Sequence, residues 1–492
     1  MIDKHSARGG AISDDPLSRR EFLKIVGIAG ATAGLGAGFG GMLTACDETA
    51  GTTTSASGAT TTAVTDTTTT TAAVASSTTV SVGPEVGRDI KVGLVSPQTG
   101  PLALFGKADD WWTEFALTNQ GDGFVCGDGK LHRLAFRKLD SRSDPDRAAQ
   151  AAGELIAYYD VDIITCSGSS ETVNPVAGKA EALECPCISS FVPWQSFVSG
   201  RVATSDASPR WTYAHAIGLE DVMGNFMAAW EQIRTNRKIG FVFANDVDGR
   251  AWADTIQGLS AVLEAAGYKY FLPDPYPVPT DDFGKHIAAF MEEECEICCG
   301  SMTTLDFSTF WKQAAKQDYK PEIVSIAKAL LFPQAVEAIG ARGRNITVEG
   351  LWQPDWPYRD SITGKTCREL AEDYMAKTGE QWTAAIAQYA KFEWAVDAFR
   401  RVRNIDDKED VIARVRTTKL DTCLGPIDFT ARVDASELNK SKRPVENVCK
   451  VPVGCAQWVG DTKFMFERTM VTNVNNPGLP IGGRVQPMVY GT

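Results

Sequence analysis

The chain has 492 residues, several times the ~150 residues of an ordinary domain, so two or three domains are expected. Apolar residues make up 43% and charged residues 23%, a mixture that excludes a mainly disordered protein and a multi-span membrane protein. The net charge of -13 argues against a nucleic-acid or anionic-membrane binding surface, because such surfaces need a basic footprint.

The beginning of the chain has the order of an export signal. Arg19 and Arg20 lie in the segment SRREFLK, which resembles a twin-arginine signal, and a Gly/Ala-rich apolar run covers 25–43. The segment LTAC, which ends at Cys46, resembles a bacterial lipoprotein box, in which the cysteine is acylated after cleavage before it. We therefore assign 1–45 to a signal peptide. A retained transmembrane helix is the alternative, because the apolar run is close to the ~20 residues that span a bilayer.

Residues 46–88 have a different composition, rich in Thr, Ser, Ala and Gly. Such a stretch buries too little apolar area to offset the entropy that folding removes, so we predict a disordered tether that starts at the lipidated Cys46. A tether of this kind gives a globular domain reach and keeps it near the membrane. The expected location is the outer face of the cytoplasmic membrane, at the cell surface or in the periplasm.

From residue 89 onward, strand-like and helix-like segments alternate. The predicted strands are 90–96, 131–139, 161–167, 187–190, 238–244, 268–272, 296–301 and 323–327. The predicted helices are 107–119, 145–159, 173–183, 250–266, 282–294 and 307–317. This alternation indicates an α/β protein with mainly parallel sheets covered by helices on both faces. Ligands of such sheets bind at the carboxyl ends of strands, so function is expected in the loops after Ser96, Ser167, Ser190, Ala244 and Ser301.

Three stretches of this region carry a resemblance to a known family. They are 90–106 (IKVGLVSPQTGPLALFG), the pair 140–146 (DSRSDPD) and 161–170 (VDIITCSGSS), and 241–249 (FVFANDVDG). In order and spacing they resemble the leucine/isoleucine/valine-binding proteins, which are type I periplasmic binding proteins of ABC importers. The resemblance runs from about residue 90 to about residue 429.

The resemblance implies a clamshell of two α/β lobes, joined by three crossovers, that traps ligand in the cleft. We place the crossovers near Tyr213, Ala327 and Gly425. The first lobe is then 89–213 plus 327–424, and the second lobe is 214–326 plus 425–492 with a C-terminal extension. Ligand stabilises the closed form, because only there do both lobes contact it, and a membrane permease would recognise that form.

Candidate ligand contacts of the first lobe follow its first and third predicted strands. Ser167, Ser169 and Ser170 lie where a strand ends and a helix begins, so their hydroxyls and the free N–H groups suit a carboxylate or polar head. The alternative is that one serine merely caps the helix. Gln98 and Phe105 lie in the first loop, and the resemblance makes Phe105 a cleft-facing aromatic, although alone it would more often be core.

Aromatic residues supply further candidates. Phe191 and Trp194 follow the fourth strand and are expected to form a cleft wall. Trp352 returns toward the cleft and is expected to stack on a ring or aliphatic face of the ligand, with burial in the core as the alternative. Pro193 removes a hydroxyl and an N–H donor from a loop in which amino-acid binders favour hydroxyl residues. A simple branched-chain amino acid is therefore less expected than a larger, amphipathic ligand.

Candidate contacts of the second lobe are acidic and hydroxyl residues. Asp246 and Asp248 lie in NDVDG, and the family often has an aromatic residue where Asp248 stands. A carboxylate there suits an ammonium or a hydroxyl-bearing ligand, and a solvated turn residue is the alternative. Thr303 and Asp306 follow the strand that ends at residue 301 and are further candidates.

Cysteines and catalytic signatures point away from an enzyme. With Cys46 lipidated, eleven of the twelve cysteines remain, and we favour Cys449–Cys455 as a local disulfide. Cys298 and Cys299 lie in a predicted buried strand without a matching second pair, so we interpret them as core residues rather than a zinc site. No nucleophile elbow, zincin motif or cysteine–histidine signature is present in the sequence. We therefore expect no catalytic residue, metal or cofactor.

Two functions agree with these observations. The first is an exported, lipid-anchored solute receptor that captures a small polar or amphipathic metabolite, amino-acid-like or related, and delivers it to an ABC permease. The second is a sensory module that uses the same clamshell to report ligand to a membrane partner without transport. The sequence shows no signalling domain, and uptake is therefore the preferred interpretation.

Overall fold

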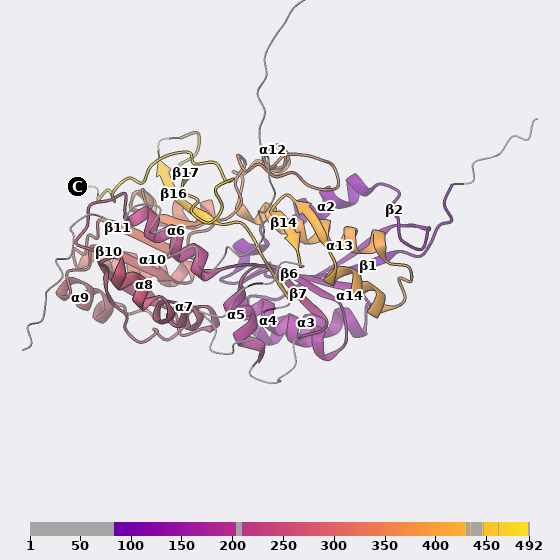
Figure 1. Ribbon diagram of the computed structural model, residues 1–492, viewed down its shortest axis with the longest axis horizontal. Helices are drawn as coiled ribbons and strands as arrows, with labels where there is room; N and C mark the ends of the chain where they lie inside the picture. Colours follow the sequence, from indigo (N-terminus) through magenta and orange to yellow (C-terminus); the bar gives the residue numbers. More distant parts are fainter. Residues whose placement is uncertain are drawn as a thin grey trace, which may run out of the picture. The chain divides into compact units, whose positions relative to one another are not determined.

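The computed structural model describes most of the chain (Figure 1). The described residues are 83–202, 209–429, 433, 445, 447–460 and 462–490. Arg19, Arg20, Cys46 and most of the expected tether lie outside these ranges. Within them, no helix has both the length and the apolar character needed to cross a bilayer.

The first lobe contains a six-stranded sheet in which all neighbouring strands are parallel. Its order is β4-β1-β5-β6-β7-β15. These strands are β1 (Ile90–Ser96), β4 (Leu134–Asp140), β5 (Ile163–Cys166), β6 (Cys187–Pro193), β7 (Thr212–Ile217) and β15 (Val448–Lys450). The central strands are buried along their whole length, as expected for a parallel sheet with two covered faces.

Helices cover both faces of the first sheet (Figure 1). Helices α3 (Pro145–Ala157), α4 (Ser170–Ala182) and α5 (Trp194–Val202) lie on one face, and α2 (Asp109–Gln120) and α13 (Ala390–Arg401) lie on the other. The neighbours Ile163 and Ile164 belong to separate apolar clusters, because successive side chains of a strand point to opposite faces. Further elements of this lobe are η1 (Ala103–Gly106), β2 (Phe124–Val125), β3 (Leu131–His132), α12 (Cys367–Thr378), η3 (Ala384–Tyr389), α14 (Lys408–Arg416), β13 (Lys419–Thr422) and β14 (Gly425–Asp428).

The second lobe contains a seven-stranded mixed sheet of order β9-β8-β10-β11-β12-β16-β17. The strands are β8 (Lys238–Phe243), β9 (Lys269–Phe271), β10 (Ile297–Ser301), β11 (Ile323–Ala327), β12 (Thr347–Gly350), β16 (Gly454–Gly460) and β17 (Phe466–Thr472). The last two pair antiparallel, and the other five are parallel. The helices are α6 (Leu219–Trp230), α7 (Val247–Gly258), α8 (Ser260–Ala265), α9 (Gly284–Glu292), α10 (Thr304–Lys316), α11 (Pro333–Glu337) and η2 (Gly340–Gly343). The predicted α/β fold class is confirmed.

The chain passes between the two sheets later than the sequence indicated. Near each expected crossover, at Tyr213, Ala327 and Gly425, the chain continues in the sheet or lobe it was expected to leave. The observed crossings follow β7, β12 and β15, that is, Ile217, Gly350 and Lys450. The reason lies in two short strands, since β12, between β11 and β16, has only four residues, and β15, at the edge of the first sheet, has three and joins it through long-range pairing.

The favoured disulfide is not formed. Cys449 and Cys455 are both free, and both are buried, as are the other cysteines of the described residues. Cys449 lies in β15 of the first sheet and Cys455 in β16 of the second, on either side of the third crossing. Burial raises the pKa of both thiols, to about 11 for Cys449, so neither is a reactive thiolate at neutral pH.

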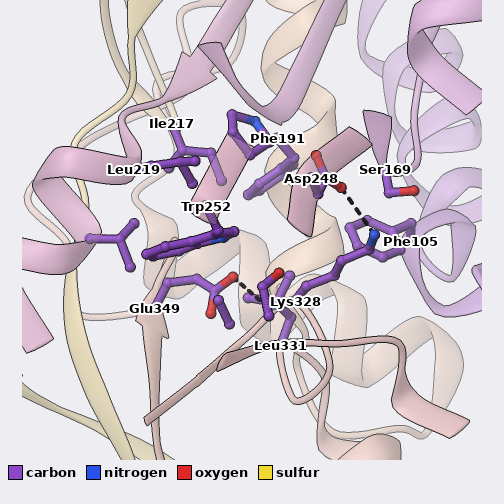
Figure 2. Close-up of a pocket in the computed structure, with 14 residues that line it drawn as sticks. Phe105, Ser169, Phe191, Ile217, Leu219, Asp248, Trp252, Lys328, Leu331 and Glu349 are labelled. Carbon is purple, nitrogen blue, oxygen red and sulfur yellow. Dashed lines mark hydrogen bonds and ion pairs between the residues drawn. The ribbon is translucent and has the colours of Figure 1, made fainter. Parts of the chain in front are cut away.

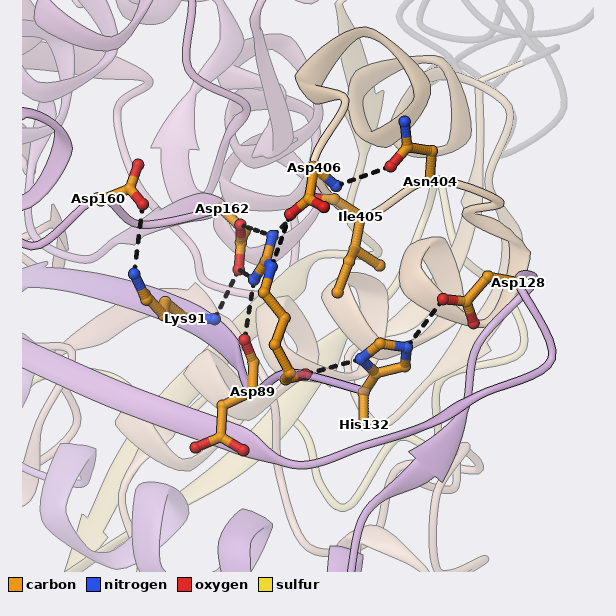
Figure 3. Close-up of polar contacts among 10 residues, drawn as sticks. Asp89, Lys91, Asp128, His132, Asp160, Asp162, Asn404, Ile405 and Asp406 are labelled. Carbon is orange, nitrogen blue, oxygen red and sulfur yellow. Dashed lines mark hydrogen bonds and ion pairs between the residues drawn. The ribbon is translucent and has the colours of Figure 1, made fainter. Parts of the chain in front are cut away.

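Arg88 fixes the start of the first lobe through contacts with Asp162 and Asp406, which Figure 3 labels. Its guanidinium donates two hydrogen bonds to Asp162, of 2.8 and 2.9 Å, and one of 2.7 Å to Asp406. Its carbonyl oxygen lies 2.7 Å from Nδ1 of His132, whose Nε2 lies 3.0 Å from the Asp128 carboxylate. A bidentate pair of this kind holds the chain firmly at the edge of the first sheet.

Candidate ligand-binding site

A cavity lies between the two lobes, at the carboxyl ends of parallel strands from both sheets (Figure 2). It encloses about 410 Å³, part of it open to solvent. The first lobe contributes Phe105, Ser169, Phe191, Pro193 and Ile217. The second contributes Leu219, Val222, Asp248, Trp252, Ser301, Ala327, Lys328, Leu331 and Glu349. A smaller space of about 190 Å³ shares Phe105, Phe191 and Leu331 with it and extends to Leu351, Ala384 and Gln388.

Three aromatic rings form much of the cavity wall. Phe105, from η1, packs edge-on against Phe332 with ring centroids 5.0 Å apart. Trp252, from α7, stacks on Phe243 at 5.9 Å. Phe191 has a φ of 65°, next to the register shift between β6 and β7, and this backbone costs roughly 1–2 kcal/mol in an L-residue. Such strain is typical of residues whose direction matters for a site.

A lysine beside the cavity forms ion pairs with carboxylates from both lobes. Lys328 directly follows β11, and its Nζ lies 3.1 Å from Asp246 and 3.0 Å from Asp248, both at the start of α7. The same Nζ lies 3.1 and 3.2 Å from the two carboxylate oxygens of Glu171, in the first turn of α4. Its backbone N–H donates to Glu349 of β12 at 2.7 Å. We call these five residues the cleft cluster.

Burial controls the protonation of the cleft cluster. Desolvation raises the pKa of Glu171 to about 8 and that of Glu349 to about 7. Burial opposes the charge of Lys328, but the surrounding carboxylates hold its pKa well above the ordinary value. Desolvation also acts against the charge of Asp246, and Lys328 outweighs it and lowers the pKa of that carboxyl.

Two oxygens of the cleft cluster have no hydrogen-bond partner among the described residues. They are Oδ1 of Asp248 and Oε2 of Glu349. Their residues are 3% and 4% exposed, and both line the cavity. An unpaired buried acceptor costs roughly 1–3 kcal/mol, so the cavity offers two acceptors that a donor group of a ligand would satisfy.

Four of the sequence candidates line the cavity and a fifth adjoins it. Phe105, Ser169, Phe191 and Asp248 belong to the lining, and Asp246 contacts Lys328 behind it. Asp246 also caps α7, since its carboxylate accepts a hydrogen bond of 2.7 Å from the N–H of Gly249.

Other first-lobe candidates point into the lobe rather than into the cavity. Ser167 accepts a hydrogen bond from the buried ammonium of Lys391, and Ser170 is the fully buried first residue of α4. The side-chain amide of Gln98 donates to Asp109 at 2.9 Å, and its oxygen accepts from Lys138 at 3.0 Å.

Trp194 and Trp352 do not occupy the expected wall positions. Trp194 packs in the core of the first lobe, and its Nε1 donates to Glu220 at 3.1 Å, while the neighbouring Pro193 lines the cavity. Trp352 is fully buried, with its ring centroid 6.3 Å from that of Trp382. Trp352 therefore follows its core alternative, and the wall position predicted for Trp194 is not observed.

Thr303 and Asp306 lie outside the lining as well. Thr303 caps α10, accepting a hydrogen bond of 3.2 Å from the N–H of Asp306. The Asp306 carboxylate in turn accepts from the hydroxyl of Tyr276 at 3.1 Å. Local capping explains both residues without a ligand.

Sequence reasoning missed Lys328, Glu171 and Glu349. Lys328 directly follows a correctly predicted strand, so the rule applied to the other strand ends would have found it. Glu171 follows Ser170 and was overlooked among the hydroxyl residues. Glu349 gave no signal, because β12 itself was not predicted.

Sequence comparison identifies the family of this fold. Residues 89–437 match the profile of a family described as periplasmic binding protein. The chain belongs to this family. Its members are solute-binding proteins that act outside the cytoplasm and are not enzymes, and the resemblance to the leucine/isoleucine/valine-binding proteins is confirmed. No curated protein matches the sequence.

Solved structures share the two-lobed arrangement at low sequence identity. The leucine binding protein LivK of Thermotoga maritima is 17% identical, with 78% of this chain and 99% of that chain covered and a TM-score of 0.58. LivJ of Streptococcus pneumoniae, in complex with isoleucine, is 13% identical, with 78% and 99% covered and a TM-score of 0.58. A solute binding protein of R. palustris, in complex with 4-hydroxybenzoate, is 15% identical, with 78% and 96% covered and a TM-score of 0.58. At these identities the likeness establishes the fold.

Proposed function

We propose that this periplasmic binding protein is the solute receptor of an ABC importer. It captures a small polar or amphipathic metabolite, amino-acid-like or related, by closing its two lobes on it. The observation that carries the proposal is the cavity between the lobes, which receives side chains from both. The ligands of LivJ and of the R. palustris protein, isoleucine and 4-hydroxybenzoate, indicate the size of molecule that this fold accepts.

Closure follows from the distribution of the lining. A ligand in the cavity would contact Phe105 and Phe191 in the first lobe and Asp248 and Trp252 in the second. Opening the lobes would remove one half of these contacts, so binding energy favours the closed form. A membrane permease that recognises the closed form would therefore receive only loaded protein.

A screen by thermal shift tests the proposal directly. The mature chain carrying Cys46→Ala is mixed with amino acids, amines, sugars and aromatic acids, and a bound ligand raises the melting temperature by mass action. We expect at least one compound class to stabilise the protein in a concentration-dependent manner. If no class does so, and the protein instead converts one of the compounds, the receptor proposal is wrong.

The same proposal includes export through Arg19-Arg20 and a lipid on Cys46. Their support is the order of the signal segments SRREFLK and LTAC and the Thr-rich stretch behind them. Replacing both arginines with lysine should leave the precursor in the cytoplasm, and Cys46→Ala should abolish incorporation of labelled lipid. Lipid incorporation into the Cys46→Ala protein would contradict the anchor.

A further inference from the structure

The charges around the cavity favour a positively charged ligand. Among the described residues that line it, Lys328 is the only cation, and Asp248 and Glu349 are the carboxylates. Glu171 and Asp246 add two more carboxylates through their contacts with Lys328. The guanidinium of Arg468 attracts Glu349 but lies outside the lining and donates to the carbonyl oxygens of Leu351 and Trp352, at 3.2 and 3.0 Å. Four carboxyl groups thus face two cations, and a cationic ligand would favour the ionised forms of Glu171 and Glu349, whose pKa values burial raises to about 8 and about 7.

Lys328 has no donor left for an anionic ligand. A lysine ammonium has three N–H donors, and this one contacts four carboxylate oxygens, from Glu171, Asp246 and Asp248. A ligand carboxylate would have to break one of these ion pairs and leave a buried charge unpaired, which is strongly unfavourable.

The start of α4, where the sequence indicated an anion site, already holds a carboxylate. Glu171 accepts a hydrogen bond from the hydroxyl of Ser169 and pairs with Lys328. A ligand carboxylate placed at Ser169 would therefore have to displace Glu171 from the Ser169 hydroxyl and from Lys328. This arrangement disfavours amino acids and aromatic acids, whose carboxylate needs such a position.

The unpartnered oxygens of Asp248 and Glu349 point instead to donor groups of a ligand. Lys328 relates the two carboxylates in space, since its Nζ contacts Asp248 and its backbone N–H contacts Glu349. One lysine side chain thus spans the distance between them. The rings of Phe105, Phe191 and Trp252 line the cavity beside these carboxylates, and aromatic faces attract both alkyl chains and cations (Figure 2).

We propose that the ligand is a small organic dication without a carboxylate, an α,ω-diamine or aminoalkyl guanidine about as long as a lysine side chain. One cationic end binds Asp248, the other binds Glu349, and the chain between them contacts the aromatic rings. This inference rests on the proposed receptor function and names its ligand class.

Isothermal titration of the mature Cys46→Ala chain with 1,5-diaminopentane tests the inference, with 1-aminopentane, leucine and 4-hydroxybenzoate as matched probes. We expect the diamine to bind. The affinity of the monoamine should be lower by about tenfold or more, because the monoamine leaves one carboxylate unpaired. Leucine and 4-hydroxybenzoate should give no heat above dilution.

Three variants locate the site. Asp248→Asn and Glu349→Gln should each weaken diamine binding about tenfold to a hundredfold. Glu393→Gln is the control, because Glu393 is equally buried but lies in α13 outside the lining and accepts from the backbone N–H of Ser361 and Cys423. Its affinity should equal that of the parent protein.

The outcomes test the dication as ligand separately from the receptor function. Binding of leucine or 4-hydroxybenzoate without binding of the diamine would overturn the dication and leave the receptor function standing. Diamine binding that Asp248→Asn and Glu349→Gln do not weaken would overturn the assigned site. Absence of any ligand in the wider screen would overturn the receptor function as well.

Discussion

Two lysines whose ammonium groups pair with buried carboxylates join the lobes of this protein, and their surroundings differ in one respect. Lys450, at the end of β15, pairs with Glu220 at 2.8 Å and with Asp221, at the start of α6, and we call these three residues the hinge cluster. Lys328 is the corresponding lysine of the cleft cluster. Both clusters combine one ammonium with a surplus of carboxylates.

The difference lies in how completely the carboxylates are paired. Glu220 also accepts from Trp194 and from Gln195, the latter at 2.6 Å, and Asp221 accepts from Asn475 at 2.8 Å. Every carboxylate oxygen of the hinge cluster therefore has a partner, whereas the cleft cluster leaves one oxygen of Asp248 and one of Glu349 without one among the described residues. A saturated cluster is typical of a structural role, and an unsaturated one beside a cavity is typical of a binding role.

The largest expected effect is on the hinge cluster. Lys450→Met removes the cation that pairs with Glu220 and Asp221 and leaves two buried carboxylates without it. Breaking a buried pair in this way typically costs ~3–5 kcal/mol, and we expect that loss in the free energy of unfolding by urea. A loss below ~1 kcal/mol would show that the hinge cluster is not structural.

The pH dependence of stability should distinguish Glu349 of the cleft cluster from Glu220 of the hinge cluster by sign. The pKa of Glu349 is raised to about 7 by burial, so the folded protein holds a proton that the unfolded chain has lost. This group therefore lowers stability as pH rises from about 4.5 to about 7, by up to ~3 kcal/mol, and Glu171, with a pKa of about 8, acts in the same direction. Glu349→Gln should flatten this decline in urea unfolding measured between pH 5 and pH 8.

The contribution of Glu220 to stability changes with pH in the opposite direction. Although burial opposes its charge, Lys450 holds the pKa of Glu220 below the ordinary value, so this pair stabilises the protein above about pH 4.5 and the benefit is lost as pH falls. Glu220→Gln should therefore cost more stability at pH 7 than at acidic pH below the lowered pKa of Glu220. Equal costs at both pH values would contradict the assigned pairing.

Ligand affinity should respond to the cleft cluster alone. Asp248→Asn should weaken binding of a cationic ligand about tenfold to a hundredfold, because a desolvated charge loses its partner. The free energy of unfolding should also fall, because the variant removes one of the buried carboxylates that pair with Lys328. Unchanged affinity with lowered stability would reverse the roles assigned to the two clusters.

The smallest expected effect concerns the aromatic wall. Phe105→Leu keeps an apolar side chain but removes the ring that faces the cavity, and we expect affinity to fall about threefold to tenfold through the lost ring contact. Trp194→Phe is the matched control, because Trp194 lies outside the lining and its change should lower stability without changing affinity.

Much of the fold was predictable, because it follows from short stretches of neighbouring residues. Strands β1, β6 and β10 are short apolar runs that end in Ser96, Pro193 and Ser301, and α3 begins with the capping residue Asp144 followed by Pro145. The edge strand β15 has three residues and joins β7 only after more than two hundred intervening residues. No local sequence pattern predicts such a pairing, so the crossovers were misplaced.

The site was predictable only in part, for the same physical reason. Strand-end reasoning found Phe105, Ser169, Phe191 and Asp248, because it depends on neighbouring residues. Lys328 lies 157 residues from Glu171 and 80 from Asp248, and only the folded chain brings these charges together. Trp194 shows the converse, since it adjoins Pro193 of the lining but points into the core of the first lobe.

Small-angle scattering tests the central claim, which is that the lobes close on a ligand held between them. The radius of gyration of the mature Cys46→Ala chain is measured without ligand and with sub-saturating and saturating concentrations of a ligand from the screen. The Asp248→Asn variant is measured at the same ligand concentrations. The account predicts a smaller radius of gyration with ligand, and a smaller change for the variant at sub-saturating ligand. An unchanged radius of gyration at saturation, together with turnover of the ligand, would contradict it.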